Sequence, residues 1–135
     1  MSKNSELRVI SGRYRSRILL SPRDERTHPM GAREKLALFN MVNVEQAIVL
    51  DAFAGSGAIG IEALSRGARE VVFVESSAKV AGIIKQNLQN LEVANVRVFI
   101  EKVAKFTKDS TFRQYFDVIF ADPPYDKVDS AEISQ

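Results

Sequence analysis

The stretch AIVLDAFAGSGAIGIEALSRG, residues 47–67, decides the fold of this chain. It opens with an apolar run that ends in Asp51, a pattern typical of a strand buried on both faces of a sheet. Gly55, Gly57 and Gly60 follow at the G-x-G-x-x-G spacing, and a helical pattern continues to Gly67. A strand that passes through a glycine turn directly into a helix predicts a nucleotide-type ligand site at the end of that strand.

Outward from this stretch, short apolar runs alternate with helical patterns. The first strand, over 47–53, is followed by predicted strands over 70–76, 95–101 and 116–122. Helices are predicted over 57–67 and 77–93, and a weak helix after the third strand. This alternation predicts βαβ units and therefore an α/β fold with a parallel sheet. Ligands bind such sheets beyond the carboxyl ends of the strands, so the glycine loop, Glu75 and the turn after the fourth strand should share one edge.

The N-terminal part has a different pattern. Two short strands, over 7–10 and 17–20, flank a glycine-containing turn, and a loop over 21–31 leads to a helix over 32–42. In that helix Leu36, Phe39, Met41 and Val42 stand near helical spacing. We therefore expect an arginine-rich hairpin and loop at 1–30 and a core at 31–135.

Composition limits the classes of protein to consider. The chain has 135 residues, 45% of them hydrophobic and 27% charged, as in an ordinary globular domain. It has no cysteine, which excludes disulfides and thiolate sites, and its single histidine argues against a histidine-rich metal site. It has neither an apolar run of membrane-spanning length nor the apolar core of a signal peptide, so a soluble cytoplasmic protein is expected.

Charge is unevenly distributed along the chain. Residues 1–40 hold nine Lys and Arg against four Asp and Glu, whereas residues 41–135 hold ten against thirteen. A basic arm on a slightly acidic body indicates a polyanionic partner, although a solvated charged face is a common alternative.

The acidic residues near the glycine loop indicate which nucleotide binds. Asp51 at the entrance of the loop would repel a phosphate but suits an ammonium group, which favours S-adenosylmethionine over a dinucleotide. Glu75 ends the second strand, where a carboxylate can accept hydrogen bonds from ribose hydroxyls.

The fourth strand ends in the motif DPPY, residues 122–125. The carboxylate of Asp122 and the carbonyl of Pro123 are acceptors that can face the N–H groups of an exocyclic amine and favour the positive charge that develops on its nitrogen. Tyr125 offers a flat ring for stacking a base that has left its helix. Taken alone, the tetrapeptide fits a rigid surface turn equally well; its place after the fourth strand favours the functional interpretation.

Several motifs together resemble the RsmD family of class I S-adenosylmethionine-dependent methyltransferases, which methylate the N2 amine of a guanine in bacterial small-subunit ribosomal RNA. The resemblance covers RVISGRYRSR (8–17), THPMGAREKLALFN (27–40), VLDAFAGSGAIGIEALSRGA (49–68) and DPPY. It implies a Rossmann-like methyltransferase sheet with an N-terminal β-hairpin extension. The family continues through further strands beyond the position of Gln135, so the core is expected to be partial, with its open sheet edge covered by those strands or by a second copy.

The resemblance also implies roles for individual residues. Those implied to contact the cofactor are Asp51, Phe53, Gly55, Ser56, Gly57, Glu75, Ser76 and the backbone of Val103. Those implied to bind and orient the target amine are Asp122, Pro123 and Tyr125, and those implied to hold RNA phosphates are Arg13, Arg15 and Arg17.

Thr27 and Arg33 stand where the family closes a lid. The chain departs from the family pattern at His28 and Met30, where Arg and Thr are usual, and at Lys102, where Asp or Asn is usual.

Three other functions remain open. The same site chemistry would suit methylation of adenine N6 in DNA or RNA, or of a glutamine amide in a protein, although the arginine hairpin argues against the last. A truncated, non-catalytic domain that binds cofactor or RNA is the alternative from another class. In the favoured interpretation the methyl group passes directly to the amine without a metal, and the partner is ribosomal RNA or the assembling small subunit.

Overall fold

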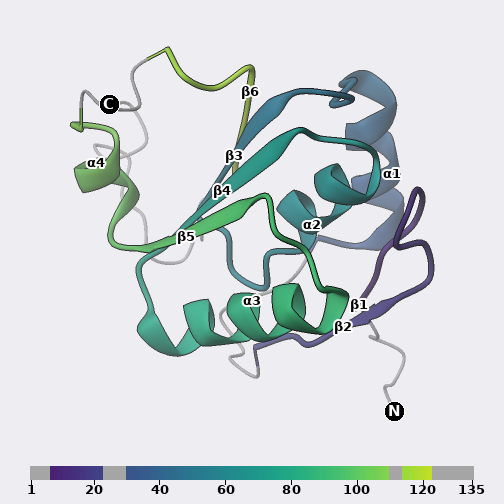
Figure 1. The fold of residues 1–135 in the computed structure, drawn as a ribbon, viewed down its shortest axis with the longest axis horizontal. Helices are drawn as coiled ribbons and strands as arrows, with labels where there is room; N and C mark the ends of the chain where they lie inside the picture. The colour runs from purple at the N-terminus through teal and green to yellow at the C-terminus, as the bar shows by residue number, and fades with distance from the viewer. Residues whose placement is uncertain (1–6, 23–29, 110–113, 123–135) are drawn as a thin grey trace.

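A computed structural model describes residues 7–22, 30–109 and 114–122, whose arrangement is shown in Figure 1. Its central sheet is entirely parallel, with strand order β5-β4-β3-β6. The strands are β3 (Ile48–Ala52), β4 (Glu70–Glu75), β5 (Val96–Ile100) and β6 (Val118–Ala121). All four predicted strands of the core are confirmed, each slightly shorter than expected. Because β6 lies on the opposite side of β3 from β4, the strand order reverses between β3 and β6, which is where such sheets bind ligands.

Helices cover both faces of this sheet. On one face lie α1 (Ala32–Met41), α2 (Ala58–Ser65) and α3 (Ala78–Leu91), which share a hydrophobic cluster with β3 and β4. On the other face α4 (Val103–Phe106) packs its Phe106 against Leu50, Val72 and Val74. The two sides follow from right-handed crossovers, because β3, β4 and β5 progress in one direction and the connection to β6 returns. No helix in the described part of the chain is long and apolar enough to cross a membrane.

The strand β4 shows why the apolar runs in the sequence are continuous. Its four residues from Val71 to Val74 have exposed fractions of 0%. Val71 and Phe73 belong to the cluster under α2 and α3, and Val72 and Val74 to the cluster under α4. A strand covered on both faces needs apolar side chains at every position, without polar alternation.

The predicted N-terminal hairpin is present but short. Its strands β1 (Leu7–Arg8) and β2 (Ile18–Leu19) are antiparallel, with Leu7 opposite Leu19. Beyond the two strands the N–H of Val9 still donates to the Arg17 carbonyl at 3.0 Å. The ladder then ends because the N–H of Ile10 donates to Glu62 (2.9 Å) and that of Leu20 to Asn87 (2.8 Å). Leu7, Val9 and Leu19 are buried in the cluster that also holds β3 and α2. The N-terminal hairpin and the rest of the chain thus share one hydrophobic core. A domain boundary at residue 30 stays a prediction.

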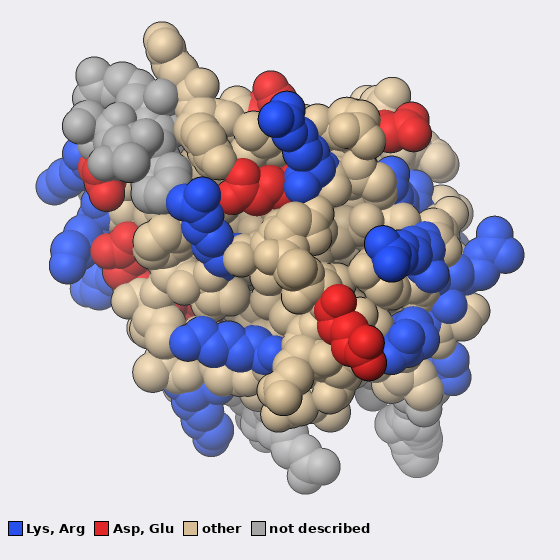
Figure 2. All heavy atoms as spheres, viewed as in Figure 1, with Lys and Arg blue, Asp and Glu red and all other residues tan. Residues whose placement is uncertain are grey.

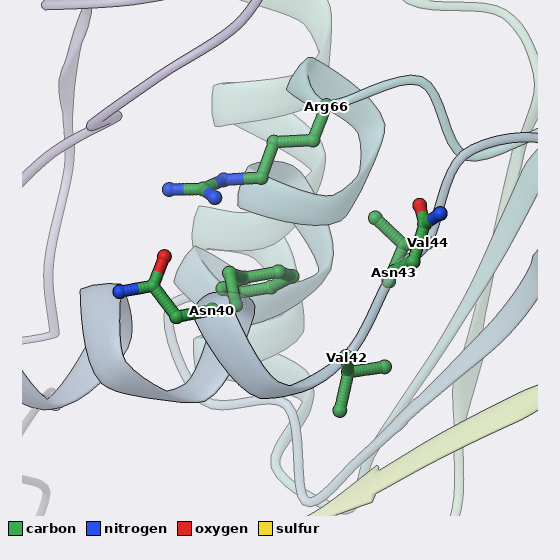
Figure 3. Close-up of a pocket in the computed structure, with 6 residues that line it drawn as sticks. Asn40, Val42, Asn43, Val44 and Arg66 are labelled. Atoms are coloured by element: carbon green, nitrogen blue, oxygen red, sulfur yellow. The ribbon is translucent and has the colours of Figure 1, made fainter.

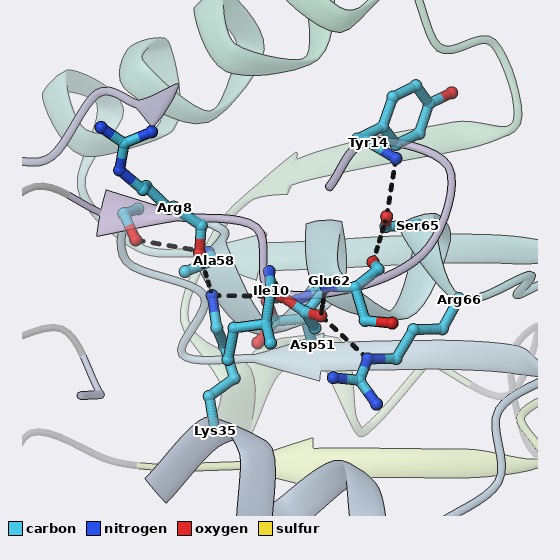
Figure 4. Close-up of polar contacts among 12 residues, drawn as sticks. Arg8, Ile10, Tyr14, Lys35, Asp51, Ala58, Glu62, Ser65 and Arg66 are labelled. Carbon is cyan, nitrogen blue, oxygen red and sulfur yellow. Dashed lines mark hydrogen bonds and ion pairs between the residues drawn. The ribbon is translucent and has the colours of Figure 1, made fainter. Parts of the chain in front are cut away.

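Helix α1 is confirmed, and of the apolar residues that predicted it Phe39 is buried and Val42 packs against the core cluster. Leu36 and Met41 are 44% and 82% exposed, whereas Lys35 is 1% exposed. Lys35 turns inward because its ammonium finds acceptors there: the Glu62 carboxylate 3.3 Å away and the Arg8 carbonyl at 2.9 Å. Figure 4 shows Glu62 at the centre of these contacts, with Lys35 on one side and Arg66 on the other.

Candidate active site

The glycine loop connects β3 to α2 in a conformation that requires glycine at two points. Gly57 precedes the first residue of α2 with φ of 83°, in the left-handed region. A Cβ at Gly60 would lie 2.3 Å from a ring carbon of Phe73, so only glycine lets α2 approach β4 this closely. Phe53 also has a positive φ, 57°, and its side chain is partly exposed at the mouth of the loop.

Asp51, at the end of β3, is a buried acid with one hydrogen-bond donor. Its exposed fraction is 2%, and its Oδ2 accepts from the N–H of Gly60 at 2.9 Å. Burial raises the pKa of the Asp51 carboxyl to about 8, against the lowering effect of the Gly60 hydrogen bond. The nearby charges of Glu75 and Asp122 raise this pKa further. The carboxyl is therefore neutral at pH 7, and a cation placed beside it would draw off its proton.

Glu75, at the end of β4, binds the glycine loop through its carboxylate. Its Oε1 accepts from the N–H of Gly55 and its Oε2 from the N–H of Ser77, both at 2.9 Å. Each carboxylate oxygen has a second lone pair, so both can still accept hydrogen bonds from hydroxyl groups. Ser76 is exposed beside it, and Ser77 caps α3 by accepting from the N–H of Val80 at 3.2 Å.

Ser56 has a different environment from the other predicted loop residues. Its side chain is buried, and its Oγ accepts from the N–H of Ala58 at 3.3 Å. Its carbonyl accepts from Nδ2 of Asn87 at 3.2 Å, and the same amide exchanges two hydrogen bonds with Leu20. Asn87 thus ties the glycine loop to the end of the hairpin segment. Sequence reasoning missed it, although a polar residue next to the apolar stripe Ile84, Leu88, Leu91 was a usable signal.

The remaining predicted site residues lie at the same edge or outside the described residues. Asp122 directly follows β6 and is exposed. Val103 is the half-buried first residue of α4, preceded by the exposed Lys102. Pro123, Tyr125 and Thr27 lie outside the described residues, and Arg33 is exposed in the first turn of α1. The structure thus brings Asp51, Glu75 and Asp122 to one sheet edge, and the roles assigned to these residues remain predictions.

The arginine-rich hairpin contacts the carboxyl-terminal ends of α2 and α3. The N–H of Arg13 donates to the Ser65 carbonyl at 2.8 Å, at the last residue of α2. The guanidinium of Arg17 donates to the Asn90 carbonyl at 3.1 Å, near the end of α3. Arg13 and Arg15 are exposed. Because both helices run antiparallel to the strands, their last residues mark the amino edge of the sheet, opposite the glycine loop.

A pocket of about 240 Å³ lies at this amino edge, between the end of α1 and the end of α2 (Figure 3). It is lined by Phe39, Asn40, Val42, Asn43, Val44 and Arg66. The Arg66 guanidinium lies 4.9 Å from the Phe39 ring centroid and 2.8 Å from Glu62 through Nε. No predicted site residue lines the pocket, and it plays no part in the site at the carboxyl edge.

Among the described residues there is also no group of three or more His, Cys, Asp or Glu that could hold a metal ion.

Comparison with known proteins gives consistent matches across the chain. A family model described as conserved hypothetical protein 95 matches residues 7–135. Ribosomal RNA small subunit methyltransferase D of Haemophilus influenzae is 41% identical over 124 residues, which are 89% of this chain and 64% of that protein. This chain thus spans less than two thirds of the length of that relative.

Solved structures share the same fold. The Escherichia coli protein yhhF matches with a TM-score of 0.80 at 31% identity, over 96% of this chain and 70% of that chain. The protein SMU.776, solved in complex with SAH, matches with a TM-score of 0.57 at 21% identity, over 68% of this chain and 25% of that chain. The predicted class I methyltransferase fold is therefore confirmed.

Proposed function

Because this chain belongs to the RsmD family, the family described as conserved hypothetical protein 95, we propose that it carries out S-adenosylmethionine-dependent methylation of ribosomal RNA. The proposed target is the exocyclic N2 amine of a guanine in the small-subunit RNA. The partner is that RNA or the assembling small subunit, and the reaction takes place in the cytoplasm.

The observation that carries the proposal is the set of acids at the carboxyl edge. A buried, neutral Asp51 lies at the entrance of a glycine loop, and Glu75 and Asp122 are close enough to influence its pKa. Acids around a loop suit a ligand that combines positive charge with hydroxyl groups, and they oppose a phosphate-bearing ligand. S-adenosylmethionine has an ammonium, a sulfonium and ribose hydroxyls. In this assignment Asp51 holds the ammonium and Glu75 accepts from the ribose.

The chemistry requires little from the protein beyond placement and hydrogen-bond acceptance. The bound cofactor supplies a methyl group on a positively charged sulfur. As the amine nitrogen bonds to the methyl carbon and the carbon–sulfur bond breaks, the nitrogen becomes positively charged and its proton leaves. Asp122, exposed at the end of β6, accepts a hydrogen bond from the amine or takes that proton. The glycine loop and Asp122 supply proximity by presenting donor and acceptor at the same sheet edge.

The exposed hairpin supports an RNA substrate. Arg13 and Arg15 are exposed at its turn, where guanidinium groups can hold phosphates without reading sequence. Such contacts would position the RNA, and the residues at the carboxyl edge would select the base.

The test compares transfer of an isotope-labelled methyl group to three substrates: small ribosomal subunits, naked small-subunit RNA and duplex DNA. We expect labelling of a guanine in the first or second, and loss of at least a hundredfold in rate for Asp122→Ala. Glu45→Ala, which removes an exposed carboxylate at the opposite edge, is the matched control and should keep full activity. Labelled adenine would replace the guanine assignment, and labelled DNA would replace the RNA assignment.

Calorimetry separates binding from chemistry in the same variants. Asp122→Ala should bind S-adenosylmethionine with nearly unchanged affinity, whereas Asp51→Ala should lose binding. Cofactor and RNA binding without transfer to any substrate would support the non-catalytic domain instead. A collapse of cofactor affinity in Asp122→Ala would contradict the role given to that residue.

A further inference from the structure

The guanidinium of Arg17 and the carboxyl end of β4 lie at opposite ends of α3. At its carboxyl end the Asn90 carbonyl accepts from the guanidinium of Arg17 at 3.1 Å. At its amino end Ser77 caps the helix and donates its N–H to Glu75 at 2.9 Å. Ser77 and Asn90 are thirteen residues apart, which at about 1.5 Å per residue is about 20 Å. An RNA held at the hairpin must cover this span to bring a base to the carboxyl edge.

The outward face of α3 is suited to a polyanion. Its exposed residues recur at helical spacing and are Ala78, Lys79, Gly82, Lys85, Gln86, Gln89 and Asn90. The helix contains no acidic residue, and the first one beyond it is its C-cap, Glu92. Figure 2, in the same orientation as Figure 1, shows basic side chains on the surface over the lower part of the molecule, where α3 lies. Lysine and amide groups on such a face can contact phosphates in any sequence.

Gly82 gives an independent indication at the middle of this face. It is exposed within the helix, and a Cβ added there would have no neighbour within 4 Å. Packing within the described residues therefore does not require glycine, although glycine inside a helix is less stable than alanine. A residue without a side chain does allow a ligand to approach the helix backbone closely. Gly82 lies between Lys79 and Lys85, where an RNA strand that follows the helix would pass.

We propose that the outward face of α3 is a track for the RNA backbone, leading from the arginine hairpin to the proposed methyl-donor site at the carboxyl edge of the sheet. This inference rests on the proposed function, because it takes RNA as the substrate. It adds Lys79 and Lys85 as phosphate contacts and Gly82 as the point of closest approach.

The test measures binding of a mixed-sequence, single-stranded 20-nucleotide RNA by fluorescence anisotropy at several salt concentrations. The variant Lys79→Gln/Lys85→Gln should bind on the order of tenfold more weakly at low salt. Its slope of log affinity against log salt should fall in magnitude by about 1.4, since each phosphate contact to a single strand contributes about 0.7. Gly82→Glu and, to a smaller extent, Gly82→Ala should also weaken binding, because each places a side chain at the point of closest approach; unchanged binding by Gly82→Ala would remove Gly82 from the track.

The matched control removes two equally exposed lysines on the opposite face of the sheet. Lys105→Gln/Lys108→Gln, in and just after α4, makes the same change in net charge and should leave affinity within about twofold of wild type. Equal losses in the two double variants would show a general charge effect and overturn the track.

A second comparison separates the track from the proposed function. If Arg13→Gln/Arg15→Gln weakens binding but the α3 double variant binds as wild type, the track is refuted while an RNA substrate stands. If the wild-type chain does not bind this RNA at all, the track is refuted, and labelling of small ribosomal subunits in the methyl-transfer assay decides the RNA function separately.

Discussion

Replacing Asp51 with asparagine should remove a specific pH dependence of stability. Burial raises the pKa of the Asp51 carboxyl to about 8 in the folded protein, whereas an aspartate in an unfolded chain has a pKa of about 3.9. Between pH 5 and 7 the folded protein therefore holds one proton that the unfolded chain has released. The free energy of unfolding then falls as pH rises, by about 1.4 kcal/mol per pH unit.

The sign and size follow from this single proton. The stability due to the protonated carboxyl is fully present below about pH 4 and is lost as the pH rises to about 8. From pH 5 to 7 the loss is about 3 kcal/mol. Asp51→Asn has no proton to release here, so its stability relative to wild type should increase by that amount over the same range. The amide also leaves a buried N–H donor without a partner, a constant cost of about 1–3 kcal/mol that does not vary with pH.

The assay is urea unfolding of both proteins at pH 5, 6 and 7, followed by circular dichroism because the chain has no tryptophan. The quantity of interest is the difference between the two free energies of unfolding, in which the titration of all other groups cancels. Equal m-values at each pH would confirm that the same surface is exposed in both proteins. A difference that stays constant from pH 5 to 7 would refute the reasoning, because it would mean that the carboxyl is ionised throughout.

Three further outcomes can be measured on the same material. Gly60→Ala should lower the free energy of unfolding by about 1–3 kcal/mol, because the new Cβ would lie 2.3 Å from a ring carbon of Phe73 in β4. Gly82→Ala, with open space at its Cβ, should raise the free energy of unfolding by about 0.5–1 kcal/mol. Equal effects of the two substitutions would contradict the packing argument. Glu62→Gln should cost about 3–5 kcal/mol because it leaves the buried Lys35 and the partly buried Arg66 without their carboxylate. The exposed Glu45→Gln should cost less than about 0.5 kcal/mol. Binding of S-adenosylmethionine at pH 6.5 should release about one proton from Asp51. The calorimetric heat of binding should then depend on the ionisation enthalpy of the buffer that takes up this proton. Identical heats in two buffers would argue against contact between the cofactor and that carboxyl.

The sheet could be predicted from the sequence because its signals are local. The run ending in Asp51, the run through Val71 and Val74, and the glycines between them each indicate their own conformation without reference to distant residues. The carboxyl-edge arrangement of Asp51, Glu75 and Asp122 then follows from parallel topology alone.

Buried polar contacts could not be predicted in the same way, because they depend on which segments meet. Lys35 looks like a surface residue of an amphipathic helix, and only the presence of Glu62 and the Arg8 carbonyl explains its burial. A glutamate inside the otherwise apolar helix AIGIEALS was the available hint. Nothing in the hairpin sequence indicates that it lies at the amino edge of the sheet, because its contacts are with Ser65 and Asn90.

The docking of the hairpin has a consequence for how the nascent chain acquires structure on the ribosome. The acceptor for the Ser11 N–H, Glu62, lies 51 residues later, and the acceptor for Arg17, the Asn90 carbonyl, lies 73 residues later. At about 5–20 residues per second, the arm waits roughly 4 to 15 s after it is made before its last anchor exists. The hairpin is therefore made well before its last anchor exists, and a chain stalled between α2 and α3 can hold the cationic arm through Glu62 and Ser65 but not yet through Asn90.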